Sequence, residues 1–223
     1  MLTTRLATAA DVSFLAHVVY EALLSSEKRC FWDDLLEGIP TETEAFLAAM
    51  LTTKATHCQI DDFLIVERDE QLVAAACIYA ATQEDYRPLR LEQMDKLAKA
   101  LGWPVQTKTE FCDRYFQVLG HDPKPTFLKP QAPWIIEYVA VVAEARGQGV
   151  GKFLLRSLLE QARQKDQLHV GIMVVNANDR AYKAYESVGF RPYETTYSSY
   201  FLNNFGFEFS GFTKFGQILT PVV

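Results

Sequence analysis

The stretch "AEARGQGVGKFLLRSLLEQARQ" (residues 143–164) ends as an amphipathic helix but begins with three glycines within five residues. Each glycine inside a helix lowers helix stability by about 1 kcal/mol relative to alanine, so three glycines at the start of a helix need an explanation. The first N–H groups of a helix lack partners and carry the positive end of its dipole, and glycines let an anion approach that backbone. The stretch therefore predicts a phosphate at the first turn of the helix.

Two common phosphate loops do not fit this sequence. The dinucleotide fingerprint is G-x-G-x-x-G, whereas Gly147, Gly149 and Gly151 place the third glycine one residue early. The Walker loop needs a hydroxyl after its lysine and a glycine at its start, but Phe153 and Arg146 stand at these positions. We expect a pyrophosphate on backbone amides, assisted by Arg146 and bound without metal. A glycine-rich turn that only packs close to the sheet is the structural alternative.

The flanking segments predict a strand on each side of this helix. "WIIEYVAVV" (134–142) is apolar on both faces, as a central or parallel strand is, and "LHVGIMVV" (168–175) is a second buried strand. "NANDRAYKAYESVGF" (176–190) predicts a helix whose end is marked by Gly189. Strand, helix, strand and helix in this order predict a parallel pair with a right-handed crossover.

The rest of the chain predicts antiparallel elements. "DFLIVERDEQLVAAACIYA" (62–80) is typical of a hairpin with a charged turn, and an aromatic C-terminal segment predicts another hairpin around Asn203. Residues 81–130 contain two helical patterns and a proline-rich exit, which predict a helical insertion. We expect one domain over residues 1–223, an α/β fold with a mixed, mostly antiparallel sheet and helices on both faces.

Composition narrows the class of protein. The chain has 223 residues, 49% hydrophobic and 22% charged, which is typical of a globular domain. Its net charge of -6 argues against nucleic acid as a partner. Charged side chains interrupt the apolar N-terminal segment and no long apolar run follows, so we expect no signal peptide, no membrane partner and a cytoplasmic protein. Cys77 lies in an apolar run, so we expect it to be a thiol in the core. The spacing of the four cysteines predicts neither a disulfide framework nor a zinc site.

Two motifs about thirty residues apart resemble those of the GCN5-related N-acetyltransferase (GNAT) family. The phosphate-binding signature [RQ]-x-x-G-x-[GA] is matched by Arg146, Gly149 and Gly151. A later pattern, N-x-x-A-x-x-x-Y-x-x-x-G-F, is matched by Asn178, Ala181, Tyr185, Gly189 and Phe190. The resemblance covers roughly residues 134 to 190.

The resemblance implies acetyl-CoA as the donor and a parallel strand pair that splays apart to admit its pantetheine arm. The arm would pair with backbone groups near Val139 and Val141, and the pyrophosphate would lie on the amides of residues 147–151. Asn178 would bind the arm or cap its helix. The implied cofactor-binding residues are Val139, Val141, Arg146, Gly147, Gln148, Gly149, Val150, Gly151, Lys152, Asn178, Ala181 and Tyr185. No metal is implied.

Two residues are candidates for proton transfer. Glu137 is a charge inside a buried strand, where burial would raise its pKa toward the range of a general base; the alternative is a strand-end carboxylate that reaches solvent or an arginine. Tyr185 shares a helical face with Ala181 and is either a general acid for the leaving thiolate or a core tyrosine.

The expected activity is acetyl transfer to a primary amine by direct attack, with a backbone N–H near Val139 polarising the thioester oxygen. The acceptor could be a small-molecule amine or a peptide amine, and a homodimer is left open. A transferase of a longer acyl group and a non-catalytic acyl-CoA sensor or scaffold are the alternatives.

Overall fold

The computed structural model describes residues 1–24, 28–81, 88–119, 132–197 and 211–221. The centre of the fold is a seven-stranded sheet with the order β1-β2-β3-β4-β5-β7-β6. Its strands are β1 (Leu2–Leu6), β2 (Phe63–Arg68), β3 (Gln71–Ala80), β4 (Trp134–Val141), β5 (His169–Val175), β6 (Arg191–Thr196) and β7 (Phe212–Ile218). Among these strands only β4 and β5 run parallel, which confirms the mixed, mostly antiparallel sheet.

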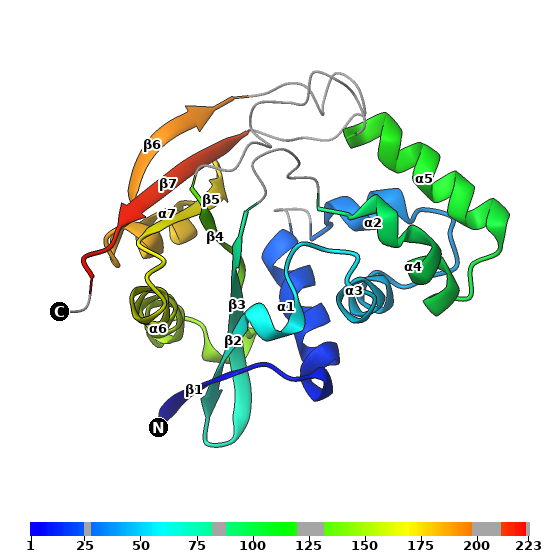
Figure 1. Ribbon diagram of the computed structural model, residues 1–223. Coiled ribbons are helices and arrows are strands. Elements are labelled where there is room, and N and C mark those ends of the chain that lie inside the picture. Colours follow the sequence, from blue (N-terminus) through cyan, green and yellow to red (C-terminus); the bar gives the residue numbers. More distant parts are fainter. Residues whose placement is uncertain (25–27, 82–87, 120–131, 198–210, 222–223) are drawn as a thin grey trace.

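Helices cover both faces of the sheet, as predicted (Figure 1). They are α1 (Val12–Leu23), α2 (Phe31–Leu35), α3 (Thr43–Thr52), α4 (Met94–Ala100), α5 (Val105–Leu119), α6 (Val150–Gln164) and α7 (Asp179–Glu186). α1 covers one face of the sheet, and α6 with α7 covers the other. The short helix α2 was not predicted from the sequence.

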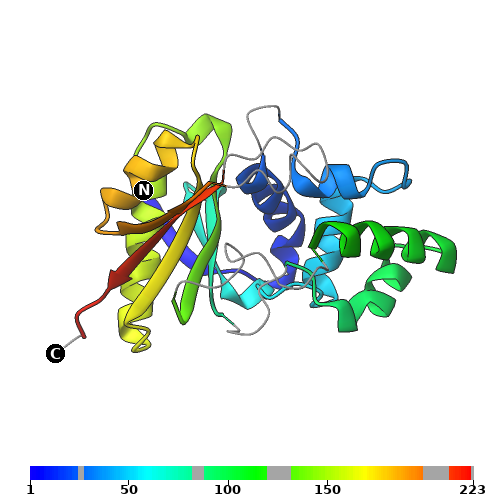
Figure 2. The same cartoon turned by 90° about the horizontal axis from the view of Figure 1, so that it is seen from above.

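The two helices predicted within residues 81–130 are α4 and α5. They lie on the far side of α1–α3 from the sheet (Figure 2). α5 shares an aromatic core with α2 and α3, and α4 adds Met94 and Leu97 to this core. In that core, the ring centroids of Trp32 and Phe46 are 5.2 Å apart, and so are those of Phe46 and Phe111. The described part of this segment therefore extends the core of the α1 face. That residues 81–130 form an insertion within a single domain remains a prediction.

Two antiparallel strand pairs correspond to the two hairpins predicted from the sequence. β2 and β3 pair antiparallel around Asp69 and Glu70, whose φ angles are +50° and +67°, as a tight two-residue turn requires. β6 and β7 also pair antiparallel, which agrees with a C-terminal hairpin. The predicted turn at Asn203 lies outside the described residues.

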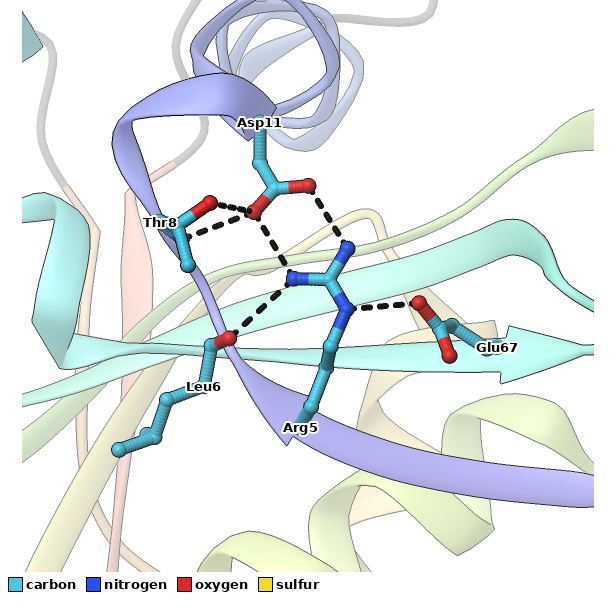
Figure 3. A network of polar contacts seen from close by, with 5 residues as sticks. All are labelled: Arg5, Leu6, Thr8, Asp11 and Glu67. Atoms are coloured by element: carbon cyan, nitrogen blue, oxygen red, sulfur yellow. Dashed lines mark hydrogen bonds and ion pairs between the residues drawn. The ribbon is translucent and has the colours of Figure 1, made fainter.

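A polar network fixes the start of α1 against the sheet (Figure 3). Asp11 accepts hydrogen bonds from the Thr8 backbone N–H at 2.8 Å and from both terminal nitrogens of Arg5 at 2.8 Å. Nε of Arg5 also pairs with Glu67 of β2 at 2.7 Å. The bond from the Arg5 guanidinium lowers the pKa of the Asp11 carboxyl well below its usual range. Arg5 of β1 thus joins the Asp11 carboxylate at the start of α1 to Glu67 of β2.

The expectation for the cysteines was wrong, because Cys77 is bonded to Cys58 as a disulfide. The two are 19 positions apart in the sequence and both are buried. The register of the first hairpin explains the contact: Cys77 on β3 faces Phe63 at the start of β2, only five residues after Cys58. Cys30 and Cys112 are free thiols.

Among the residues described, no helix is long and apolar enough to cross a membrane.

Candidate active site

The parallel strands separate halfway along their length. β4 pairs with β5 only over Trp134–Ile136 and Val170–Ile172, and no described pair follows toward the carboxyl ends. On its other side, β4 has a bulge against β3, because Glu137 faces Cys77 whereas Ala140 faces Ala75. Tyr138 takes up the extra residue with φ of +55°, an uncommon conformation for a bulky side chain. β4 therefore presents backbone edges of residues 137–141 that β5 does not cover.

The glycine-led turn follows directly after this separated segment. Gly147 and Gly149 have φ angles of +77° and +79°, and a Cβ added at either would meet nothing within 4 Å. Gly149 is the residue that precedes the first turn of α6. Gly151 differs, because its Cβ would lie 3.5 Å from the side chain of Val141. The first two glycines thus leave space above the helix N-terminus, while the third allows close packing on β4.

A cavity of about 320 Å³ joins the separated strand to this turn. Its lining consists of Glu21, Val139, Ala140, Val141, Ala145, Arg146, Gly147, Gly149, Val150, Gly151, Lys152, Leu155, Asn178, Arg180, Ala181, Ala184 and Tyr185. It brings together every predicted cofactor-binding residue except Gln148. The amide of Gln148 turns elsewhere, donating to the Glu144 carbonyl at 2.7 Å and accepting from Arg68.

Two charged residues of this lining were not among the predicted site residues. Arg180, in the first turn of α7, adds a further cation to the lining. Its place between Asn178 and Ala181 of the motif was an available signal. Glu21 comes from the last turn of α1 and pairs with Nη2 of Arg146 at 2.5 Å. Nothing in the sequence marks that contact, since the two residues are 125 positions apart.

α7 contributes a capped N-terminus and a buried phenol. Asn178 accepts from the Ala181 N–H at 3.0 Å, so its capping role is confirmed. Tyr185 is buried and packs edge-on against Phe190 and Phe215, with centroids 6.3 and 5.7 Å away. Burial raises the pKa of its phenol, so Tyr185 stays protonated at neutral pH while lining the cavity.

Glu137 does not line the cavity. It is half-buried and pairs with Cys77 of the neighbouring strand β3, whose side chain lies in the core on the α1 side of the sheet. The next residue, Tyr138, stacks on Phe63 with centroids 6.4 Å apart. Burial raises the pKa of Tyr138, the charge of Glu137 adds to this, and a hydrogen bond with Thr56 opposes it. Glu137 and the cavity are therefore on opposite sides of the opening between β4 and β5.

Another hollow in the described part of the structure lies apart from this cavity. A larger hollow of about 640 Å³ lies over β5, β6 and β7 and contains none of the predicted site residues. Within the described ranges, no group of three or more histidine, cysteine or acidic side chains could hold a metal ion.

The segment that forms this site is similar to a known protein family. Residues 113–190 match the model of the Acetyltransferase (GNAT) family, and this range contains β4, the glycine-led turn, α6, β5 and α7. This segment of the chain is therefore similar to the acetyltransferases of that family. A search of curated protein sequences gave no match.

Solved structures of acetyltransferases share the GNAT fold of the chain. An N-acetyltransferase from Staphylococcus aureus Mu50 is 20% identical, with a TM-score of 0.60 over 97% of this chain and 100% of that one. An acetyltransferase from Salmonella typhimurium, solved with its cofactor acetyl-CoA, is 15% identical, with a TM-score of 0.54 over 100% and 96%. An aminoglycoside acetyltransferase in complex with coenzyme A is 18% identical, with a TM-score of 0.53 over 98% and 95%.

Proposed function

We propose that this GNAT domain transfers an acetyl group from acetyl-CoA to a primary amine, which attacks the thioester directly. The observation that carries this is the continuous cavity from the separated strand β4 to the two left-handed glycines before α6. An extended pantetheine arm could pair with the open backbone of β4, and a pyrophosphate fits the space above Gly147 and Gly149. Two of the structural neighbours were solved with acetyl-CoA or coenzyme A, which supports the same donor.

The residues of the chain have separate tasks in this proposal. The backbone near Val139, next to the bulge at Tyr138, would donate a hydrogen bond to the thioester oxygen as negative charge develops on it. The protonated Tyr185 would donate its phenolic hydrogen to the leaving sulfur. Glu137, on the α1 side of the opening, would accept the proton of the acceptor ammonium directly or through a water. The acceptor would therefore approach from the α1 side and the donor from the α6 side.

The class of acceptor is a small-molecule or peptide amine, and residues 81–130 with the C-terminal hairpin are proposed to shape its pocket. Replacement of residues 81–130 by a short linker should preserve acetyl-CoA binding and abolish or broaden acceptor use. Normal acceptor kinetics in the linker variant would contradict this role.

The decisive experiment is an amine panel with detection of released thiol, run beside calorimetric titration of acetyl-CoA. Turnover with at least one amine supports the proposal, and failure to bind acetyl-CoA would refute it. Binding without turnover of any amine would favour an acyl-CoA sensor. Repeating the assay with longer acyl-CoA donors distinguishes acetyl transfer from transfer of a longer group.

A further inference from the structure

Glu21 is an unexpected residue in the cavity, because it brings a negative charge to the place proposed for a pyrophosphate. It lies in the last turn of α1, and its Oε2 is 2.5 Å from Nη2 of Arg146. The same guanidinium donates from Nε to the Val141 carbonyl at 2.9 Å. Arg146, the arginine of the phosphate-binding signature, is therefore held by a carboxylate at the end of a different element.

This arrangement changes what an incoming anion would meet. A guanidinium has five N–H donors, and two sides of this one are occupied by Glu21 and Val141. Its positive charge is already matched by the Glu21 carboxylate. A pyrophosphate above Gly147 and Gly149 would therefore meet a neutral ion pair, unless the contact between Glu21 and Arg146 weakens.

Glu21 could instead serve to hold Arg146 in place for the phosphate, so the two effects must be weighed. The side chains of Arg146 and Glu21 are 39% and 25% exposed, and ion pairs of this kind contribute little to holding a geometry. The Val141 carbonyl already orients the guanidinium. A pyrophosphate that approaches Arg146 would, in contrast, be repelled by the Glu21 carboxylate for as long as that carboxylate stays on the guanidinium. Competition therefore outweighs positioning.

We propose that Glu21 lowers the affinity of the protein for acetyl-CoA and coenzyme A by competing with the pyrophosphate for Arg146. This inference rests on the proposed function, because it concerns the same donor site. A looser hold on the pyrophosphate also favours departure of the coenzyme A product, a step that limits turnover in many enzymes.

The test compares ligands with and without the pyrophosphate. Acetyl-CoA, coenzyme A and S-acetylpantetheine are titrated by calorimetry into the wild type and Glu21→Gln. We expect Glu21→Gln to bind acetyl-CoA and coenzyme A about tenfold more tightly, with a gain that shrinks as salt is added. Affinity for S-acetylpantetheine, which has no pyrophosphate, should be unchanged. Unchanged or weaker binding of acetyl-CoA, or an equal gain for S-acetylpantetheine, would overturn the inference.

Two further variants test the route of the effect. In an Arg146→Gln background, Glu21→Gln should give a much smaller gain, and a gain of the original size would overturn competition for Arg146. Glu160→Gln is the matched control, since Glu160 is an exposed glutamate on α6 that pairs with Arg163 at 3.2 Å. A comparable gain in Glu160→Gln would indicate a bulk charge effect and overturn the inference. A wild type that binds no acetyl-CoA would refute the proposed function itself, whereas normal wild-type binding with an unaltered Glu21→Gln refutes only this inference.

Discussion

Ile136 of β4 and Ile172 of β5 form the last pair between the two parallel strands. Both side chains are buried beneath α6 in the core on that face. Beyond them β4 continues for five residues through its bulge to Val141, and then enters the glycine-led turn. The proposed donor site therefore begins where a parallel ladder ends, and it is completed by a helix N-terminus.

Substitution of Gly149 tests the phosphate end of this site. A side chain at Gly149 would stand in open space at the cavity, in a backbone conformation with φ of +79°. We expect Gly149→Val to lose about 1–2 kcal/mol of unfolding free energy from the left-handed conformation. It should also bind acetyl-CoA at least tenfold more weakly, measured by calorimetry.

Gly38→Val is the matched control for backbone strain. Gly38 has φ of +75° and equally open surroundings, but it does not line the cavity. It should show a similar loss of unfolding free energy with wild-type affinity for acetyl-CoA. If a folded Gly149→Val protein binds acetyl-CoA as the wild type does, the pyrophosphate is not bound at this turn.

Tyr185→Phe removes one hydroxyl from the cavity and keeps the edge-on packing of the ring. If the phenol donates to the leaving thiolate, kcat should fall about 10²-fold while acetyl-CoA affinity stays unchanged. Because burial raises the pKa of Tyr185, the wild-type phenol remains protonated between pH 6 and 9. The loss in kcat should therefore be the same across that pH range.

Tyr182→Phe supplies the comparison for this substitution. Tyr182 is on the same helix and packs edge-on against Phe215 with centroids 4.8 Å apart, but it does not line the cavity. Its loss of a hydroxyl should leave kcat near the wild-type value. Full activity in Tyr185→Phe would make Tyr185 a packing residue.

The fold was predictable where local chemistry decides it. The glycines before α6, the Asn178 cap and the turn at Asp69 and Glu70 each have a short-range signal, and each was found at its predicted place. α2 escaped prediction because a helix of five residues is too short to show a period. The bond between Cys58 and Cys77 escaped because it depends on the register of a hairpin, which cysteine spacing does not reveal.

The candidate site, like the fold, was predictable where short motifs mark its residues and was not predictable where tertiary packing places them. Apart from Glu21, the residues that line the cavity fall in two ranges, 139–155 and 178–185, that carry motifs, so most of them could be found from the sequence. Glu21 could not be found, because α1 meets the Arg146 turn only through tertiary packing. Gln148 lies within the motif, but its side chain bonds to Glu144 and Arg68, and a motif does not show the direction of a side chain.

The Asp11 network predicts a pH-dependent contribution to stability. Asp11→Asn should lower the unfolding free energy at pH 7 by about 2 kcal/mol, because it removes the charge that pairs with Arg5 and weakens a cap. The pKa of Asp11 is lowered in the folded state, so this contribution is fully present above the unfolded pKa, near 4, and is lost as the pH falls toward the folded value. Denaturant unfolding should show a constant difference from wild type between pH 8 and about 5, which shrinks below about pH 4.

Glu67→Gln is the control for the Asp11 experiment. Glu67 pairs with the same arginine, but its side chain is 25% exposed against 7% for Asp11. The loss of unfolding free energy should be below about 1 kcal/mol. A difference between Asp11→Asn and wild type that stays constant down to pH 2 would contradict the assigned role of the carboxylate.

Glu137→Gln tests the acceptor side of the reaction. If Glu137 removes a proton from the acceptor ammonium, kcat/KM should fall most near neutral pH, where the amine is mostly protonated and needs a base. Activity should recover in part as the pH rises toward the amine pKa, because free amine becomes abundant without help. Tyr185→Phe should show no such recovery, since its missing hydroxyl becomes no more available at high pH. Profiles of kcat/KM against pH for both variants, the wild type and Glu160→Gln would decide this: a Glu137→Gln profile parallel to that of wild type, without selective recovery, would mean that Glu137 is not the base.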